Sequence, residues 1–307
     1  MEKYIIYNLT RRGLFSEILN LALAKSYADF MGMTIIVNTR NWNARIKNGW
    51  NDYFLPTLPC INCFCTSQVY VTGRKKKIGL RDWFHSPSRV MLHYVLCVAN
   101  QICQKRNKSF LLNDEIYDKM RSNDFVCRMP KLDIFIQYKK ILTDLFVFND
   151  DIKRQIDSLK SRIGLPEKYI GVHIRRGDKI LTKEMDDIDI EQYIYEIINK
   201  SNMSMNIYIA TDDHSVISII QERLHALGFS IYYNIYVSQE GFSEKKYNRK
   251  RKSDKFIDTL YTLLDVCILM EATFFIGTYS SNLSRIIPCF IDESRCKSLD
   301  IDWNIVF

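Results

Sequence analysis

Long hydrophobic runs are absent from this sequence. No apolar stretch approaches the roughly 18 residues that a membrane-spanning helix needs. The N-terminus, MEKYIIYNLTRRG, begins with a strand-like pattern and not with a secretory leader. Glycine and proline are scarce, with 11 and 6 residues, and there is no low-complexity tract. These absences argue against membrane-spanning and disordered proteins, and we expect a globular protein of the cytoplasm.

The cysteines lack the spacing of a metal site. There are 9 of them, an odd number, and several have the apolar neighbours that are typical of reduced thiols in a protein core. The one cluster, CINCFC at 60–65, has no second CxxC and no histidine pair at ligand spacing. We therefore predict no bound metal.

Positive charge is in excess, with 43 Lys and Arg against 35 Asp and Glu and a net charge of +8. Much of the excess lies at Arg74–Lys77 and Lys245–Lys255. Such clusters attract nucleic acid or anionic membranes, but these two lack interleaved stacking aromatic residues. Solvated loops are the simpler interpretation, and no nucleic-acid partner is expected. An anionic donor or acceptor substrate is the alternative.

Strands and helices alternate along the chain, whose 307 residues suit two domains. In the first half, strand-like segments at 3–8 and 33–38 flank a helical pattern at 16–31. The second half alternates helices with apolar strands, as parallel α/β domains do, at 169–174, 205–210, 230–233 and 273–277. The Gly-Leu-Pro turn at 164–166 separates the halves. The predicted fold is therefore α/β, with an N-terminal α/β domain at 1–164 and a Rossmann-like domain at 165–307.

The stretch YIGVHIRRGDK, residues 169–179, joins an apolar strand to a dense group of charges. Arg175, Arg176, Asp178 and Lys179 lie at its carboxyl end, where open α/β sheets bind their ligands. Adjacent arginines are costly to bury without an anion, and a guanidinium fits phosphate oxygens. A phosphate-bearing ligand is one interpretation. The other is an ion pair of Arg175 or Arg176 with Asp178 that closes the strand end.

Polar residues follow two further strands of the second domain. Thr211, Asp212 and Asp213 end one strand, and Thr278–Asn282, TYSSN, ends another and enters a helix. The carboxyl ends of parallel strands lie on one edge of a sheet, so we expect these residues near Arg175. Hydroxyl and free N–H groups at a helix start suit a diphosphate, and plain N-capping is the alternative.

Asp265 lies inside the apolar helical run YTLLDVCILME at 261–271. A carboxylate there costs desolvation unless strong donors meet it. The N1–H and amino groups of guanine are two such donors side by side; the alternative is that Asp265 faces solvent. In the first domain, Gly13 precedes a helix whose free N–H groups and dipole favour an anion.

Three segments together carry a family resemblance: GVHIRRGDK at 171–179, YIATDD at 208–213 and LLDVCILMEATFFIGTYSSNLSR at 263–285. They resemble the α-1,6-fucosyltransferases of glycosyltransferase family 23, which include the bacterial nodulation enzymes. GLFSEILN, TIIVNTRNW and NGWNDYF resemble the family more loosely in the first half.

The resemblance implies a GT-B-like fold in which two Rossmann-like domains face a cleft. The second domain then binds a GDP-sugar, and the first lies on the acceptor side. No membrane anchor, stem coiled coil or SH3-like domain is recognisable. The sequence therefore resembles a reduced catalytic unit from a bacterium or a virus, which in the viral case would act in the host cytoplasm.

The resemblance also assigns residues to the donor. Arg175, with Arg176 beside it, matches the arginine that holds the β-phosphate of GDP-fucose, and His173 and Asp265 match residues that contact guanine. The other donor-binding residues that it implies are Gly13, Ser16, Asp178, Asp212, Asp213, Thr278, Ser280, Ser281, Asn282 and Arg285. Asn282 stands where the family commonly has Gln, and Phe15 stands in place of its second glycine.

The implied reaction is an inverting, metal-independent transfer of L-fucose from GDP-β-L-fucose to a hydroxyl of a glycan acceptor, without a cofactor. Arg175 and the Ser280–Asn282 helix start would stabilise the departing diphosphate. The rival interpretations are a transferase for another GDP-sugar, such as GDP-mannose or GDP-rhamnose, and a non-catalytic protein that binds sugar or nucleic acid through the basic loop.

A carboxylate must accept the proton of the acceptor hydroxyl in this reaction. Without gaps, the glutamate of the family falls on Lys183, next to Glu184. We therefore assign the base to Glu184, supported by Lys179, with Asp186 and Asp187 as alternatives. The DxD pairs, Asp187-x-Asp189 and Asp300-x-Asp302, follow no predicted strand and are interpreted as surface charge.

Overall fold

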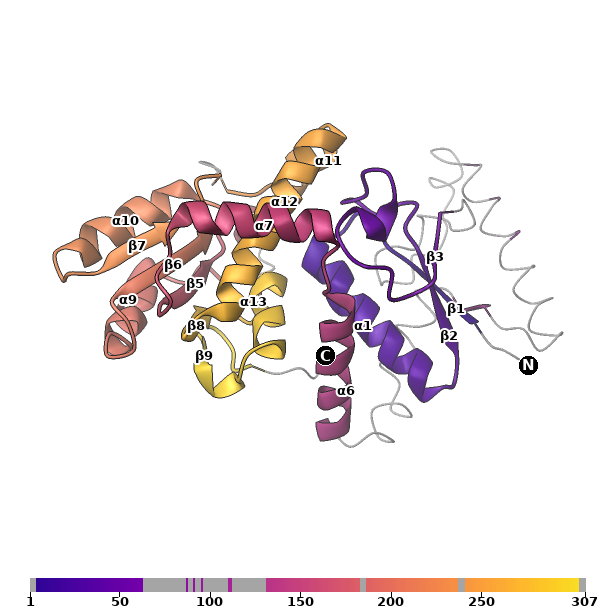
Figure 1. Ribbon diagram of the computed structural model, residues 1–307, viewed down its shortest axis with the longest axis horizontal. Helices are drawn as coiled ribbons and strands as arrows, with labels where there is room; N and C mark the ends of the chain where they lie inside the picture. The colour runs from indigo at the N-terminus through magenta and orange to yellow at the C-terminus, as the bar shows by residue number, and fades with distance from the viewer. Residues whose placement is uncertain are drawn as a thin grey trace. The chain divides into compact units, whose positions relative to one another are not determined.

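The computed structural model describes residues 4–62, 87, 91, 95, 110–111, 131–182, 186–236 and 241–303 (Figure 1). The chain falls into two compact units that divide between Asn149 and Asp150. This division lies earlier than Gly164, where the sequence predicts the domain boundary. Both units are α/β with parallel sheets. In the parts of the chain that the structure describes, no helix is long and apolar enough to cross a membrane.

The first unit is built on a four-stranded parallel sheet in the order β3-β2-β1-β4. The helices α1 and α6 pack on each other, and the Tyr138 hydroxyl of α6 donates to the Leu19 carbonyl oxygen of α1 at 3.2 Å. The elements are β1 (Tyr4–Asn8), α1 (Leu14–Phe30), β2 (Thr34–Asn38), the 3-10 helix η1 (Gly49–Asp52), β3 (Cys60–Ile61), β4 (Phe110–Leu111) and α6 (Lys131–Leu145).

Aromatic residues of the first unit form a buried cluster after β2. Trp42 and Trp50 stack with ring centroids 5.7 Å apart, and Trp50 stacks on Phe54 at 4.6 Å. The Asp52 carboxylate accepts from the backbone N–H groups of residues 46–48, which fixes the loop that leads to Trp50. Burial of these rings stabilises the irregular segment that follows β2.

The second unit is built on a five-stranded parallel sheet in the order β7-β6-β5-β8-β9. Its helices and strands are α7 (Asp150–Ile163), β5 (Ile170–Ile174), α8 (Gly177–Leu181), α9 (Ile190–Asn199), β6 (Asn206–Thr211), α10 (His214–His225), β7 (Ser230–Tyr233), α11 (Glu244–Arg249), α12 (Lys252–Glu271), β8 (Phe274–Gly277), α13 (Asn282–Ile286), η3 (Ile287–Cys289), η4 (Glu293–Arg295) and β9 (Cys296–Ser298).

Alternation along β5 decides which side chains reach each face of this sheet. Ile170 and Val172 belong to a core cluster formed with α9 and α10. The intervening Gly171 faces α12 so closely that a Cβ there would lie 2.9 Å from the Cβ of Ala272. By the same alternation His173 lies on the α12 face, so the polar end of the strand is directed to that side.

The prediction of an irregular basic loop at Lys245–Lys255 is wrong. The structure has α11 there, followed by the first turn of α12. Lys, Arg and Glu are good helix formers, and Ser243 caps α11 by accepting from the backbone N–H of Lys246 at 3.4 Å. Turn residues are needed to break a helix, and a high density of charge does not replace them.

Candidate active site

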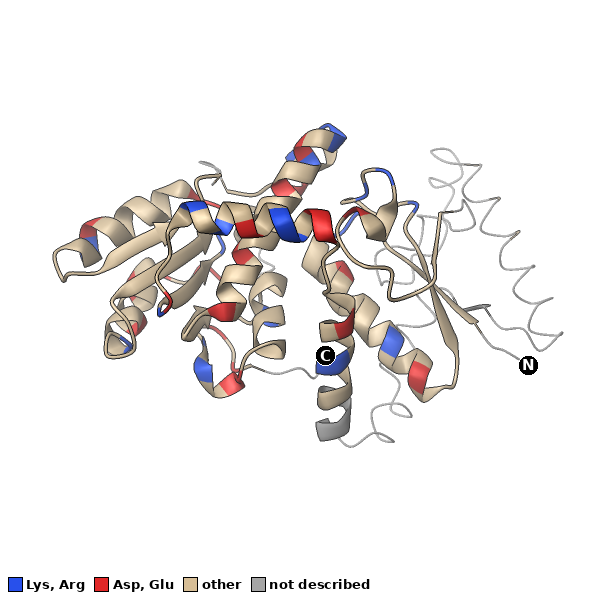
Figure 2. Ribbon diagram, viewed as in Figure 1, with Lys and Arg blue, Asp and Glu red and all other residues tan. Residues whose placement is uncertain are grey.

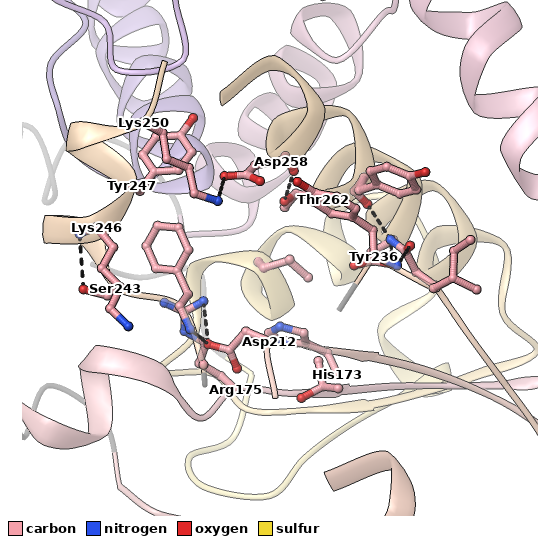
Figure 3. Close-up of a pocket in the computed structure, with 18 residues that line it drawn as sticks. His173, Arg175, Asp212, Tyr236, Ser243, Lys246, Tyr247, Lys250, Asp258 and Thr262 are labelled. Atoms are coloured by element: carbon pink, nitrogen blue, oxygen red, sulfur yellow. Dashed lines mark hydrogen bonds and ion pairs between the residues drawn. The ribbon is translucent and has the colours of Figure 1, made fainter. Parts of the chain in front are cut away.

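A pocket of about 440 Å³ opens where β5 and β6 end. Its lining comes from these strand ends, from residues 234–236 and 241–243, from α11 and Lys250 just after it, from α12 and from Leu283 of α13 (Figure 3). Five of the residues singled out at the strand ends and in the apolar helix line it together: His173, Arg175, Thr211, Asp212 and Asp265. The ends of β5 and β6 lie at one edge of the sheet, as the parallel pairing of these strands requires, and Asp265 of α12 lines the same pocket.

Arg175 is held by two carboxylates at the floor of the pocket. Its Nη2 lies 3.2 Å from Asp178 Oδ1 and its Nη1 lies 3.2 Å from Asp212 Oδ2. The guanidinium also lies over the Phe242 ring, 4.8 Å from the centroid. The ion pair with Asp178 that the sequence allows is therefore present, and Arg175 lines the pocket as well. Within the described residues, its buried Nε has no hydrogen-bond partner.

Asp212 joins three segments around this arginine. Its Oδ1 accepts from the backbone N–H of Arg176 at 2.8 Å, and its Oδ2 accepts from that of Phe242 at 2.9 Å. Gly177 makes this junction possible, because a Cβ there would lie 2.4 Å from the Phe242 carbonyl oxygen and 2.6 Å from Asp212 Oδ2. The side chain thus fixes the position of Arg175 relative to the segment that begins at Gly241.

His173 is buried and uncharged. Burial and the nearby Arg175 charge lower its pKa to about 3. Its Nδ1 lies 2.6 Å from the Ser284 hydroxyl, which also accepts from the Thr278 backbone N–H at 3.4 Å. The Ser284 oxygen has two lone pairs, so its hydroxyl donates to Nδ1 or accepts from it according to the imidazole tautomer. In the tautomer with the proton on Nε2, the imidazole accepts from Ser284 at Nδ1 and presents a donor through Nε2.

Asp265 does not face open solvent, because it lies against β6 and the segment after β7. Burial raises its pKa to about 7, against the opposing effect of hydrogen bonds from Tyr208 and Asn234. The Tyr208 hydroxyl donates to Oδ1 at 2.6 Å, and Asn234 Nδ2 donates to the same oxygen at 3.3 Å. Neither bond uses Oδ2, and the residue lines the pocket. The carboxylate is therefore anchored through one oxygen while the other stays available to a ligand.

In the turn after β8, donors that the sequence offers to a diphosphate are bonded to a carboxylate of the chain itself. The Asp300 carboxylate, which follows β9, accepts from the backbone N–H groups of Tyr279 at 2.7 Å and Ser280 at 3.0 Å. It also accepts from the hydroxyl groups of Ser280 at 2.5 Å and Ser298 at 2.7 Å. An internal carboxylate thus takes the donors that the sequence offers to an anion.

The interpretation of Asp300 as surface charge is wrong. Burial tends to raise its pKa, but the hydrogen bonds from Ser280 and Ser298 outweigh this effect, so the pKa lies below its ordinary value. The three-residue strand β9, which has no apolar pattern, is what brings Asp300 beside the end of β8. Its sequence neighbourhood alone could not show this placement.

Other residues predicted for the site lie outside the pocket lining. Asp213 caps α10 by accepting from the Ser215 backbone N–H at 2.9 Å. Arg176 pairs with Asp187. Arg285 lies over the Tyr279 ring at 4.2 Å and donates to the Tyr279 carbonyl oxygen at 3.1 Å. Thr278 and Ser281 are buried, and Asn282 begins α13.

In the first unit, Gly13 precedes α1 with φ −56°, and among the described residues other than its chain neighbours no atom lies within 4 Å of a Cβ built there. Ser16 Oγ lies 3.4 Å from Asn20 Nδ2. Glu17, which no sequence pattern marks, is a buried carboxylate that accepts from the Thr10 hydroxyl at 2.5 Å and from the Thr10 backbone N–H at 3.1 Å. Burial raises the pKa of Glu17 to about 7.

The assigned base, Glu184, and the side chain of Lys179 lie outside the described residues. Of the alternatives, Asp186 is exposed and Asp187 pairs with Arg176. Asp189 caps α9 by accepting from the Glu191 backbone N–H at 3.1 Å. Among the residues with described positions, no group of three or more His, Cys, Asp or Glu side chains is placed to hold a metal ion.

Comparison with known proteins relates this architecture to fucosyltransferases. Residues 23–288 match the profile of the N- and catalytic domains of α-(1,6)-fucosyltransferases. The fucosyltransferase NodZ from Bradyrhizobium shares 15% identity over 95% of this chain and 94% of its own, with a TM-score of 0.54.

Two further solved structures have the same fold. NodZ α-1,6-fucosyltransferase co-crystallised with GDP gives 15% identity, coverage of 95% and 93%, and a TM-score of 0.54. POFUT1 in complex with GDP gives 12% identity, coverage of 97% and 98%, and a TM-score of 0.54.

Proposed function

Because the chain belongs to the α-(1,6)-fucosyltransferase family, we propose that this glycosyltransferase moves L-fucose from GDP-β-L-fucose to a hydroxyl of a glycan acceptor, with inversion at C1 and without a metal. Structures of NodZ soaked with GDP-fucose and of POFUT1 in complex with GDP-fucose support this donor. The single observation that carries the proposal is the convergence of His173, Arg175 and Asp265 on one pocket. The second unit binds the donor, and the first lies on the acceptor side.

The polar pattern of the pocket suits a guanine base. Guanine presents one acceptor, O6, beside two donors, N1–H and the amino group. His173 supplies a donor through Nε2–H, and Asp265 supplies a carboxylate whose Oδ2 is not used by Tyr208 or Asn234. Uracil and adenine lack two adjacent donors, so a carboxylate in a desolvated site favours guanine over both.

Arg175 binds the diphosphate in this proposal. A guanidinium matches two phosphate oxygens at once, and its position is fixed by Asp178 and Asp212. When the bond from C1 to the diphosphate breaks, negative charge grows on the leaving oxygen, and a cation already in place stabilises it. This is the role that a metal would otherwise fill.

The proton of the acceptor hydroxyl passes to Glu184 in this proposal, with Asp186 and Asp187 as the other carboxylates of that segment. Asp187 forms an ion pair with Arg176, so its carboxylate is already engaged by a cation. As C1 gains oxocarbenium character, the acceptor oxygen attacks from the face opposite the diphosphate. Lys179 supports the base.

Nucleotide binding followed by turnover tests the proposal. Calorimetry with GDP, UDP and ADP should show that GDP binds tightest, and GDP-fucose with an array of glycans should release GDP in the presence of EDTA. If the protein turns over GDP-mannose in preference to GDP-fucose, the assignment of the sugar is wrong, whereas the assignment of the nucleotide stands. Tighter binding of UDP than of GDP would refute the nucleotide assignment and the reaction with it.

A further inference from the structure

The basic segment of the second unit forms a wall of the pocket. Lys246, Tyr247 and Lys250 line the same cavity as His173 and Arg175. Lys and Arg make up half of α11 (Figure 2), and Figure 3 shows Lys246 and Lys250 on the α11 side, across from Arg175 and Asp212. The positive charge that the sequence places in a solvated loop is therefore partly directed into the site.

The start of this wall is bonded to the partners of Arg175. The Phe242 backbone N–H donates to Asp212 Oδ2 at 2.9 Å, and its carbonyl oxygen accepts from the Asp178 N–H at 2.9 Å. The Glu244 backbone N–H donates to Asp178 Oδ2 at 2.6 Å. The two carboxylates that hold the guanidinium thus also hold the beginning of α11. A shift of one side of the pocket would disturb the other.

The end of the wall is fixed to α12. Lys250 Nζ lies 2.7 Å from Asp258 Oδ2, and the Tyr247 hydroxyl lies 3.1 Å from the Thr259 hydroxyl. Lys255 lies over the Tyr247 ring at 5.2 Å. The helix α11 is consequently held at both ends, and its side chains keep a defined position over the strand ends.

The charge balance around Arg175 calls for a further cation when a diphosphate binds. One guanidinium with the carboxylates of Asp178 and Asp212 carries a net charge of −1, so this group does not by itself favour an anion. Two lysines of this wall, Lys246 and Lys250, line the pocket. Lys246 lies about one helical turn nearer than Lys250 to the Phe242–Ser243 junction, and Phe242 is bonded to both Asp178 and Asp212.

On the basis of the function proposed above, we infer that Lys246 is a second phosphate-binding cation, which holds the diphosphate of the GDP-sugar against Arg175. A lysine suits this position because its ammonium on a flexible stem can follow oxygen atoms whose charge and position change as the sugar leaves. Lys246 thereby makes α11 part of the donor site.

Lys246→Met tests this inference, because methionine keeps the apolar stem and removes the charge. The matched control is Lys245→Met, at the adjacent lysine of α11, which is exposed and does not line the pocket. Calorimetry should show GDP binding weakened by about 10-fold or more in Lys246→Met. Guanosine, which has no phosphate, should bind this variant within about twofold of the wild type, and Lys246→Arg should recover most of the loss.

The outcomes separate this inference from the proposed function. If Lys246→Met binds GDP as the wild type does while Arg175→Ala loses it, the inference is overturned and the function stands. Equal losses for GDP and guanosine would also overturn it, since they would indicate damage to the pocket and not a lost phosphate contact. A wild-type protein that prefers UDP to GDP would overturn both.

Discussion

The ends of β5 and β8 both offer hydrogen-bond donors to an anion, but they are occupied differently. At β5, the Arg175 guanidinium is shared by Asp178 and Asp212 and still lines the pocket. At β8, the donors of Tyr279 and Ser280 are taken by Asp300. A carboxylate beside a guanidinium leaves room for an anionic ligand. A carboxylate that accepts from the backbone N–H groups of a turn occupies the place that such a ligand would take.

The difference shows why a sequence motif for an anion site is not sufficient. Hydroxyl and N–H groups at a helix start are competent donors wherever they occur. Whether a ligand can reach them depends on residues distant in sequence, such as Asp300. The comparison predicts that substitutions at the end of β5 act on ligand binding and that those at the end of β8 act on stability.

Arg175→Ala should have the largest effect on GDP binding. Removing the guanidinium takes away one partner of the charge pair that Arg175 would form with the diphosphate. Such a loss in a largely buried pair costs roughly 2–5 kcal/mol of binding free energy, so we expect GDP affinity and turnover to fall by about 100-fold or more. Arg175→Lys keeps the charge but lacks the planar guanidinium, so it should recover only part of the lost GDP affinity. Arg223→Ala, at an exposed arginine that also pairs with a carboxylate, is the control. If Arg175→Ala binds GDP within tenfold of the wild-type affinity, a difference in binding free energy on the order of 1.4 kcal/mol, the end of β5 does not act on ligand binding as we expect.

Gly177→Ala should have the next largest effect, because it acts on the junction behind Arg175. A Cβ at this position would overlap the Phe242 carbonyl oxygen, and displacement of that peptide moves both walls of the pocket. We expect GDP affinity to fall by about 10-fold with a measurable loss of Tm. An unchanged Kd for GDP would show that the junction does not position the site.

Asp265 should make guanosine binding depend on pH. The neutral carboxyl cannot accept from both guanine donors, and its pKa in the free protein is raised to about 7. Guanosine affinity should therefore fall by up to about 10-fold as the pH is lowered from 8 to 6. Guanosine is used because it has no phosphate that titrates in this range. Asp265→Asn should bind guanosine weakly at both pH values. If the wild type binds guanosine with the same affinity at both pH values, Asp265 does not contact the guanine.

The same residue links pH to folding stability. Its pKa in the folded state lies above the ordinary value of 3.8, so the folded protein holds this proton more tightly than the unfolded chain. The stability that this proton contributes is present below about pH 4 and is lost as the pH rises through about 7. Asp265→Asn should remove this component, so that Tm decreases less between pH 5 and 8 than in the wild type.

Asp300→Ala should have the smallest effect on GDP binding and a clear effect on stability. The substitution removes the acceptor of the Ser280 N–H and of the Ser280 and Ser298 hydroxyl groups, while the Tyr279 N–H keeps the Ser298 hydroxyl at 3.0 Å. The loss costs about 1–3 kcal/mol for each group that water cannot reach. Tm should fall by about 4 °C or more, with GDP affinity unchanged within about threefold. Markedly tighter GDP binding would show instead that the turn after β8 is a phosphate seat that Asp300 blocks.

The sequence predicted the regular strands of the second unit well, because apolar β-branched residues leave a local pattern. The strand expected at 169–174 is observed at Ile170–Ile174. The strand β9 was missed, since the sequence Cys-Lys-Ser has no such pattern. That two domains face a cleft stays a prediction.

The site was predictable only where a strand end or an isolated charge marked it. Arg175 and Asp212 follow apolar strands, and Asp265 interrupts an apolar helix. Asn234 and Tyr208, which hold Asp265, have ordinary surroundings in the sequence. Lys246 was hidden in a run of charges, and only the fold distinguishes it from Lys245.

The carboxylates of Asp178 and Asp212 also bear on how the enzyme releases its product. They are counter-ions of Arg175, so in the proposed reaction an arriving diphosphate would exchange with them and a departing one would leave no bare guanidinium behind. Exchange of this kind weakens equilibrium binding but lowers the barrier to dissociation. If GDP release limits turnover, Asp178→Asn should bind GDP more tightly, release it more slowly in stopped-flow measurements, and turn over more slowly than the wild type.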